Sequence, residues 1–193
     1  LSKLYHWKIY VVGSVEYQYP NHLFQAGYFL DKKYYDENTI DFKHLLLSEK
    51  NQSLLKDIQN SNSVGVHIRR GDYMTKQNLV IFGNICTQKY YHDAIRIITE
   101  KVNDAVFYVF SDDISWVQTH LDIPNAVYVN WNTGESSIYD MYLMSSCKYN
   151  IIANSTFSYW AARLNKKTNM VIYPSKWYNT FTPDIFPESW CGI

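Results

Sequence analysis

Cysteine is scarce in this sequence, and neither sign of charge is in excess. The three cysteines, Cys86, Cys147 and Cys191, lie far apart and form no Cys-x-x-Cys pair. This pattern argues against a disulfide framework or a zinc site and favours a reducing compartment. Lysine plus arginine and aspartate plus glutamate each total 18, so the formal net charge is zero. No overall field therefore attracts nucleic acid or an anionic membrane, and any anion must bind to a local cluster.

Long apolar segments are also missing. No apolar run approaches the roughly 20 residues that span a membrane, and the first residues do not resemble a signal peptide. The chain begins at Leu1 without a methionine, from which we expect a fragment of a longer protein. With 193 residues, of which 47% are hydrophobic, it suits one domain with a core, or one domain plus part of another.

Hydrophobic periodicity divides the chain into two parts. Residues 1–62 predict a partial N-terminal or interdomain segment that is mostly helical or irregular, with leucines spaced for a helix between residues 36 and 60. Residues 63–193 alternate short strands with helices, which predicts an α/β fold with a Rossmann-like parallel sheet and helices on both faces. The expected strands are 63–69, 105–111, 126–131, 149–154 and 169–174, and the expected helices are 88–103, 112–121, 137–147 and 155–165.

Polar residues gather just after four of these strands. In an open parallel sheet, ligands bind in the crevice beyond the carboxyl ends of the strands, so these positions are the candidates for a site. They are Arg69-Arg70-Gly71-Asp72, Ser111-Asp112-Asp113, Asn130-Trp131-Asn132 and Asn154-Ser155-Thr156.

The first of these strands and its end read VGVHIRRGDY. Because side chains alternate across a strand, His67 and Arg69 share one face, and Arg70 points the other way as the chain turns. Arginine suits bidentate capture of phosphate, and Asp72 could orient one arginine by pairing with it. One alternative is an Arg–Asp pair that only ties down a loop, with His67 a satisfied core histidine. The other is an adhesion signal in Arg70-Gly71-Asp72.

The segment Asn154-Ser155-Thr156 leads from a strand into a helix. Asn154 or Ser155 can cap that helix, whose free N–H groups and positive dipole end form an anion site. Thr156 and Ser158 add hydroxyl groups. An ordinary capped helix is the structural alternative.

Acidic residues offer two further candidates. Asp112 and Asp113 stand at a predicted helix start, where capping is the favoured interpretation. Asp140 lies among apolar neighbours, where its carboxylate can accept two hydrogen bonds from a guanine edge or can be a surface group on an amphipathic helix. The motifs GxGxxG, GxxxxGK[ST], HExxH and Asp-x-Asp are all missing. A bound diphosphate would therefore be stabilised by arginine and a helix end, without Mg²⁺.

Three blocks of sequence, HIRRGDY, FYVFSDDISWV and DMYLMSSCKYNIIANSTFSYWAARLN, resemble the α-1,2-fucosyltransferases of glycosyltransferase family 11. The resemblance covers most of the chain. It implies the GDP-fucose-binding lobe of a GT-B-type enzyme, which transfers L-fucose from GDP-β-L-fucose to the 2-hydroxyl of a terminal galactose, with inversion and without a metal or other cofactor. The first block occurs in looser form in α-1,6- and protein O-fucosyltransferases. These classes remain alternatives, as does a GDP-sugar-binding fragment without activity.

The resemblance also implies roles for individual residues. Arg69 would hold the β-phosphate and stabilise the leaving GDP, His67 would lie beside the nucleotide, and Asp140 would recognise the guanine base by accepting its hydrogen bonds. Asp72 is the nearest candidate for the base that deprotonates the acceptor. The expected substrate contacts are His67, Arg69, Arg70, Asp140, Asn154, Ser155, Thr156 and Ser158, and no metal ligand is expected.

Two departures from the family pattern concern the acceptor. A glycine-rich GGLGNQ-type segment of the N-terminal lobe is missing, and the helix that usually reads close to SFSWWGAWLN is TFSYWAARLN here. We expect as partners GDP-fucose and a galactose-terminated oligosaccharide or glycolipid. We place the reaction in the bacterial cytoplasm and leave peripheral association with the inner membrane open.

Overall fold

The computed structural model describes residues 10–12, 24–26 and 42–193, which fall into two compact units. The first unit contributes two short strands, β1 (Tyr10–Val12) and β2 (Phe24–Ala26), which pair in parallel. These strands lie within 1–62, where we expected mostly helical or irregular chain. The part of the expected 36–60 helix that precedes residue 42 lies outside the described residues.

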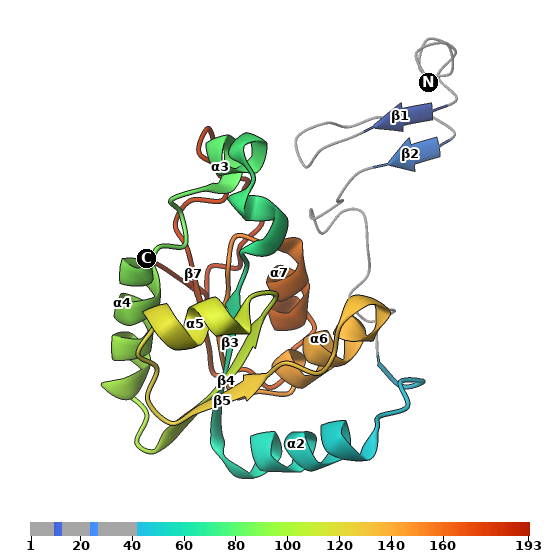
Figure 1. The fold of residues 1–193 in the computed structure, drawn as a ribbon, viewed down its shortest axis with the longest axis vertical. Coiled ribbons are helices and arrows are strands. Elements are labelled where there is room, and N and C mark those ends of the chain that lie inside the picture. Colours follow the sequence, from blue (N-terminus) through green and yellow to red (C-terminus); the bar gives the residue numbers. More distant parts are fainter. Residues whose placement is uncertain (1–9, 13–23, 27–41) are drawn as a thin grey trace. The chain divides into compact units, whose positions relative to one another are not determined.

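The second unit is built on a sheet that has six parallel strands within residues 42–193 (Figure 1). The strands lie in the order β5-β4-β3-β6-β7-β8. Their bounds are β3 Asn62–Ile68, β4 Ala105–Ser111, β5 Ala126–Val129, β6 Tyr149–Ile151, β7 Met170–Tyr173 and β8 Cys191–Gly192. The predicted parallel α/β fold is confirmed.

Helices cover both faces of this sheet (Figure 1). On one face, α4 (Gln88–Thr99) and α5 (Ile114–His120) share a core with Val64 and Val66 of β3. On the other face, α2 (Glu49–Asn60), α6 (Ser137–Ser145) and α7 (Thr156–Arg163) share a core with Tyr108 and Phe110 of β4. A short turn, η2 (Gly71–Met74), and helix α3 (Lys76–Phe82) follow β3, and η3 (Gly134–Ser136) precedes α6.

Local sequence explains where the long helices begin. Ser48 Oγ accepts the N–H of Asn51 at 3.3 Å before α2, and Thr87 Oγ1 accepts the N–H of Tyr90 at 3.3 Å before α4. Such caps satisfy N–H groups that have no partner within the helix. Behind each cap, apolar residues recur at helical spacing and turn one buried stripe toward the sheet.

Helix α2 belongs with the sheet. Its Leu54 and Ile58 are buried in the same core as Leu143 of α6. The compact unit comprises residues 40–182 and 187–193, so it begins before the boundary that we expected at residue 63. Within the described ranges, no helix is both long and apolar enough to cross a membrane.

The strand order determines where a ligand can enter the sheet. The chain passes from β3 to β4 and β5 on one side, and later places β6, β7 and β8 on the other side. The order therefore reverses between β3 and β6, as it does in the Rossmann arrangement. Ligands bind beyond the carboxyl ends of the strands at this switch point. The residues that follow Ile68 and Ile151 are thus the ones positioned to form a site.

Candidate functional site

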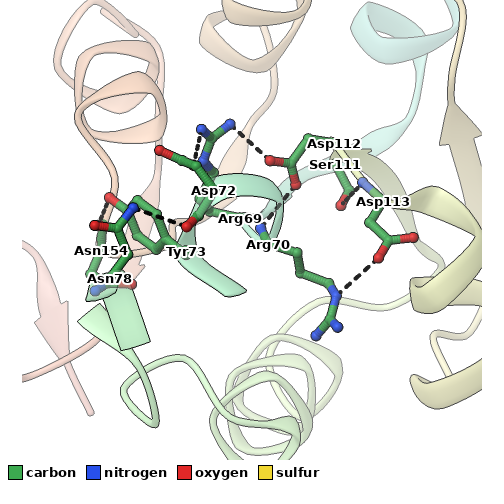
Figure 2. A network of polar contacts seen from close by, with 9 residues as sticks. All are labelled: Arg69, Arg70, Asp72, Tyr73, Asn78, Ser111, Asp112, Asp113 and Asn154. Atoms are coloured by element: carbon green, nitrogen blue, oxygen red, sulfur yellow. Dashed lines mark hydrogen bonds and ion pairs between the residues drawn. The ribbon is translucent and has the colours of Figure 1, made fainter. Parts of the chain in front are cut away.

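Arg69 and Arg70 leave the end of β3 with their guanidinium groups directed apart, as Figure 2 shows and as the alternation along the strand predicts. The Nη1 group of Arg69 forms an ion pair with Asp112 Oδ2 at 2.8 Å, and its Nη2 group donates to Asp72 Oδ1. The Arg69 side chain is 33% exposed, so its guanidinium can still be reached by a ligand. Arg69 is therefore a cation that two carboxylates fix in place at the switch point.

Arg70 is held separately, by groups at the start of α5. Its Nε group pairs with Asp113 at 3.2 Å, and its guanidinium lies over the Trp116 ring, with Cζ 3.6 Å from the ring centroid. Within the described part of the chain, its two terminal nitrogens make no hydrogen bond (Figure 2). Arg70 therefore has a fixed position and unused donors.

Asp112 joins the end of β4 to the turn after β3. Its Oδ1 atom accepts the backbone N–H of Arg70 at 2.9 Å, in addition to the ion pair with Arg69. A Cβ atom on Gly71 would clash with Asp112 Oδ2, so any larger residue at Gly71 would displace that carboxylate. Asp113 caps α5 by accepting the N–H of Trp116 at 3.1 Å. Capping, which we favoured for both aspartates, is therefore right for Asp113, whereas Asp112 positions the arginines.

Asp72 lies in the η2 turn, and its side chain is 57% exposed. Its carbonyl oxygen accepts from the Asn78 side chain at 2.9 Å, and the neighbouring Tyr73 hydroxyl donates to the Asn154 carbonyl at 3.0 Å (Figure 2). The Arg70-Gly71-Asp72 segment is thus part of a hydrogen-bonded turn whose aspartate is already ion-paired. An adhesion signal needs a flexible, exposed loop, so this geometry disfavours that alternative.

His67 is 5% exposed and faces α7, where its ring centroid lies 5.1 Å from that of Phe157. Burial, and secondarily the charge of Arg69, lowers the pKa of His67 to about 3. The imidazole is therefore neutral near pH 7. Its Nδ1 atom is buried and has no hydrogen-bond partner among the described residues. A satisfied core histidine, one alternative from the sequence, would not leave that atom unpaired.

Asn154 is 2% exposed, and protein groups use all the polar atoms of its side chain. Its Nδ2 group donates to the carbonyls of Trp177 at 3.0 Å and Phe82 at 3.3 Å, and its Oδ1 atom accepts from the Cys86 thiol at 3.3 Å. We expected Asn154 to contact substrate directly. The geometry instead makes it the residue that fixes the loop after β6.

The residues after Asn154 differ in their access to a ligand. Ser158 is fully buried, and its hydroxyl bonds with the backbone of Ala153 at 3.2 Å and 3.3 Å, so it supports the loop rather than meeting the substrate. Ser155 is the N-cap residue of α7, but its side chain makes no capping bond, contrary to our expectation. Thr156 is half-buried at the first position of the helix. The α7 N-terminus therefore keeps N–H groups that a bound anion can use.

Asp140 lies in the first turn of α6 and is 9% exposed. Its Oδ1 atom accepts from Asn132 Nδ2 at 2.7 Å, and Asn132 also bonds with Asn51 of α2. Burial raises the pKa of Asp140 to about 7, although the bond from Asn132 opposes the shift. No hydrogen bond or ion pair among the described residues links Asp140 to the Arg69 network. Asp140 is a partly protonated carboxyl group at neutral pH, separate from the arginines.

Comparison with protein-family models matches residues 7–193 to glycosyl transferase family 11. The chain belongs to this family. It is 35% identical, over 94% of its length, to an alpha-1,2-colitosyltransferase of Escherichia coli, and the alignment covers 63% of that relative. It is 28% identical, over 78% of its length, to the galactoside alpha-(1,2)-fucosyltransferase 2 of Pongo pygmaeus, of which 48% is covered. The chain thus spans less than two thirds of each of these relatives.

Among solved structures, the fucosyltransferase NodZ from Bradyrhizobium is similar to this family 11 chain with a TM-score of 0.43 and 18% sequence identity. The match covers 58% of this chain and 39% of NodZ.

In the family 11 chain, the fold brings together some of the predicted site residues and separates others. Arg69 and Asp72 meet at the end of β3, Arg70 points away from them toward Trp116, and His67 lies against α7. Asp112 joins them, although capping was its favoured interpretation from the sequence, and so does Tyr73, which the sequence did not assign to the site. The parallel register of β3 and β4 places Ser111 opposite Ile68, which brings Asp112 beside Arg69. No local sequence pattern indicates that register.

Replacing Asp112 with asparagine should disturb the site of this family 11 protein without unfolding it. Asparagine keeps an oxygen for the Arg70 N–H but loses the charge that holds Arg69. We expect a fall in kcat of about tenfold to a hundredfold, since a hydrogen bond to a charged group contributes about 1.5–3 kcal/mol. Steady-state kinetics and a thermal melt would test this. A melting temperature that falls while kcat is unchanged would show that Asp112 acts only in folding.

Proposed function

We propose that this protein transfers L-fucose from GDP-β-L-fucose to the 2-hydroxyl of a terminal galactose, with inversion and without a metal. The observation that supports this best is Arg69, held in place at the switch point between β3 and β6. A fixed, partly exposed guanidinium there can bind a diphosphate and stabilise its charge as it leaves. Membership of glycosyl transferase family 11 makes a nucleotide sugar the natural source of that diphosphate.

The two carboxylates on Arg69 differ in how firmly they are held. Asp112 also binds the Arg70 N–H, whereas the Asp72 side chain is 57% exposed. A diphosphate that binds Arg69 would therefore displace Asp72 rather than Asp112. The released Asp72 carboxylate is then free to accept the proton of the acceptor hydroxyl. This exchange couples donor binding to activation of the acceptor.

The transfer step follows from these positions. The acceptor oxygen attacks C1 of fucose on the face opposite the diphosphate, so the new C–O bond forms as the bond to the β-phosphate oxygen breaks. The bonding electrons leave with GDP, whose charge Arg69 and the α7 N-terminus stabilise. The acceptor proton passes to Asp72. The neutral His67 offers a hydrogen bond beside the nucleotide, and the ionised Asp140 accepts from the guanine edge.

We propose as acceptor a galactose-terminated oligosaccharide or glycolipid, modified in the bacterial cytoplasm. The cysteines Cys86, Cys147 and Cys191 are all free thiols, which agrees with a reducing compartment.

The direct test is transfer of fucose from GDP-fucose to lactose by the complete gene product, with the linkage read by NMR. An α-1,2 product is expected, and EDTA should leave the rate unchanged because arginine and a helix end replace the metal. An α-1,6-linked product would reject the proposed linkage. GDP binding by calorimetry without any transfer would reduce the proposal to a nucleotide-binding module.

Colitose is the second candidate for the donor sugar, because a relative aligned over 94% of this chain is named an alpha-1,2-colitosyltransferase. Colitose is fucose without its 3-hydroxyl. A site that hydrogen-bonds this hydroxyl rejects the sugar that lacks it by about 10⁴–10⁵-fold. Measuring kcat/KM with GDP-fucose and GDP-colitose therefore decides between them. We expect GDP-fucose to be preferred, and a preference for GDP-colitose would replace fucose in the proposal.

A further inference from the structure

A cavity of about 260 Å³ opens beyond β3 on the side of α4 and α5. Its walls come from the end of β3, from η2 and α3, and from the starts of α4 and α5. They include Arg69, Arg70, Met74, Phe82, Gln88 and Trp116. His67 is not part of these walls, because its ring faces Phe157 of α7. Arg69 therefore lies in the wall of this cavity, whereas His67 faces α7 on the other face of the sheet.

The size of the cavity limits what can occupy it. Pockets for drug-sized ligands have volumes of about 300–1,000 Å³, so a cavity slightly below that range suits a single ring with its substituents. The walls also include Tyr73 and Met74, which directly follow Asp72 in η2. A ring bound here would thus lie next to the segment that carries the proposed base.

The chemistry of the walls suits a sugar. Met74, Leu79 and Phe82 supply an apolar surface for the C–H face of a pyranose, and Asn84 and Gln88 supply amide groups for its hydroxyls. Arg70 adds donors, since its terminal nitrogens have no bond among the described residues. Trp116 stacks on the Arg70 guanidinium, so it holds these donors in the wall. A few fixed polar groups in an apolar cavity are typical of small-ligand sites.

We propose that this cavity binds the terminal sugar of the acceptor. The inference rests on the proposed transfer reaction, and it assigns the two sides of Arg69 to the two substrates. The donor lies beside His67 and the α7 N-terminus, and the acceptor sugar lies against Arg70, α3 and the start of α4. The attacking hydroxyl then meets C1 of the donor sugar at the boundary between them, where Arg69 and Asp72 lie.

Two substitutions test the cavity without touching the proposed donor contacts. Met74→Trp fills the cavity from a side chain that is 47% exposed, and Gln88→Ala removes one amide from its wall. Gln118→Ala on α5 is the matched control, because Gln118 is exposed and is not part of the cavity. Each variant of the complete protein is assayed for the KM of lactose, the KM of GDP-fucose and the slow hydrolysis of GDP-fucose without acceptor.

Gln88→Ala should raise the KM of lactose about fivefold to tenfold, as expected for one lost hydrogen bond, and Met74→Trp should raise it more than tenfold. The KM of GDP-fucose and the hydrolysis rate of both variants should stay within about twofold of the parent, as should all three quantities for the control, because these substitutions leave the proposed donor contacts in place. An unchanged KM for lactose would overturn the inference. A parallel rise in the KM of GDP-fucose would also overturn it, by assigning the cavity to the nucleotide.

Binding measured by saturation-transfer NMR separates this inference from the proposed function. With GDP present, methyl β-D-galactoside should give signals with the parent protein and the control, and weak signals with Met74→Trp. If no fucose transfer occurs but these binding results hold, the proposed function fails and the cavity remains a galactoside site. If the parent gives no signal, or Met74→Trp keeps it, the cavity assignment fails whatever the activity.

Discussion

Replacing Arg69 with alanine is expected to lower kcat for fucose transfer about 10²–10³-fold, the usual loss when one fixed donor to a developing charge is removed. The guanidinium stabilises the diphosphate most strongly in the transition state, because the negative charge on the diphosphate oxygens increases as the bond to fucose breaks. The effect should fall mainly on kcat rather than on the KM of the donor, since Asp140 and α7 would still bind GDP-fucose. Kinetics at saturating GDP-fucose and lactose measure it.

Two variants control for the structural role of Arg69. Removing it leaves the Asp72 and Asp112 carboxylates unpaired, so a thermal melt must accompany the kinetics. Arg69→Lys keeps the charge but not the bidentate geometry, and should recover part of the rate. Arg96→Ala, which removes an exposed arginine from α4, should have no effect. Near-normal transfer by a folded Arg69→Ala variant would reject the role of Arg69.

Donor affinity should fall as the pH decreases through 7, because of Asp140. In the proposed donor complex its carboxyl group must be ionised to accept two hydrogen bonds from guanine, and burial raises its pKa to about 7. The ionised fraction of Asp140 in the free protein then falls about tenfold between pH 8 and pH 6. A tenfold change corresponds to about 1.4 kcal/mol of binding free energy. Calorimetry with GDP at both pH values should show a matching rise in Kd. His67, whose pKa is about 3, is neutral throughout this range.

The same shift predicts an opposite effect on stability. Because the folded pKa of Asp140 lies above the ordinary value of 3.8, the folded protein binds this proton more tightly, and stability is lost as the pH rises from about 4 to about 7. Asp140→Asn should therefore raise the free energy of unfolding at pH 8 by on the order of a few kcal/mol, while it weakens GDP binding and removes its pH dependence. Asp122→Asn is the exposed control. Unchanged GDP binding by Asp140→Asn would exclude guanine recognition by this residue.

Hydrophobic pattern was sufficient to predict the main strands. The apolar run at 105–111 matches β4, and the run at 63–69 differs from β3 by one residue at each end. The run at 149–154 overshoots β6, which ends at Ile151. The reason is that Ala153 and Asn154 bond with Ser158 and Cys86, contacts that a strand pattern does not contain.

The neighbourhood of the site was harder to predict than the sheet. Residues 71–82 carry no clear periodicity, so η2 and α3 were not predicted. The cavity was not predicted either, because these two elements form part of its wall. The role of Asp112 depends on the register between β3 and β4. The burial of Ser158 depends on how the first turn of α7 packs against the loop after β6. Each role thus depends on a contact that the local sequence pattern does not contain, either with a residue on another strand or with a residue brought near by a turn. The arginines could be recognised from the sequence because two adjacent arginines are unusual at the end of a strand.

The central position of β3 implies that the two walls of the site differ in rigidity. Strand β3 is hydrogen-bonded to β4 along its whole length and to β6 from Val64 to Val66, so its amides should exchange with solvent only during global unfolding. Helix α3 has no buried residue, and Val80 is 74% exposed, so its amides should exchange through local opening. The arginines are thus anchored to the slowest-exchanging part of the protein, while α3, on the opposite side of the cavity, can shift to fit the proposed acceptors of different shape.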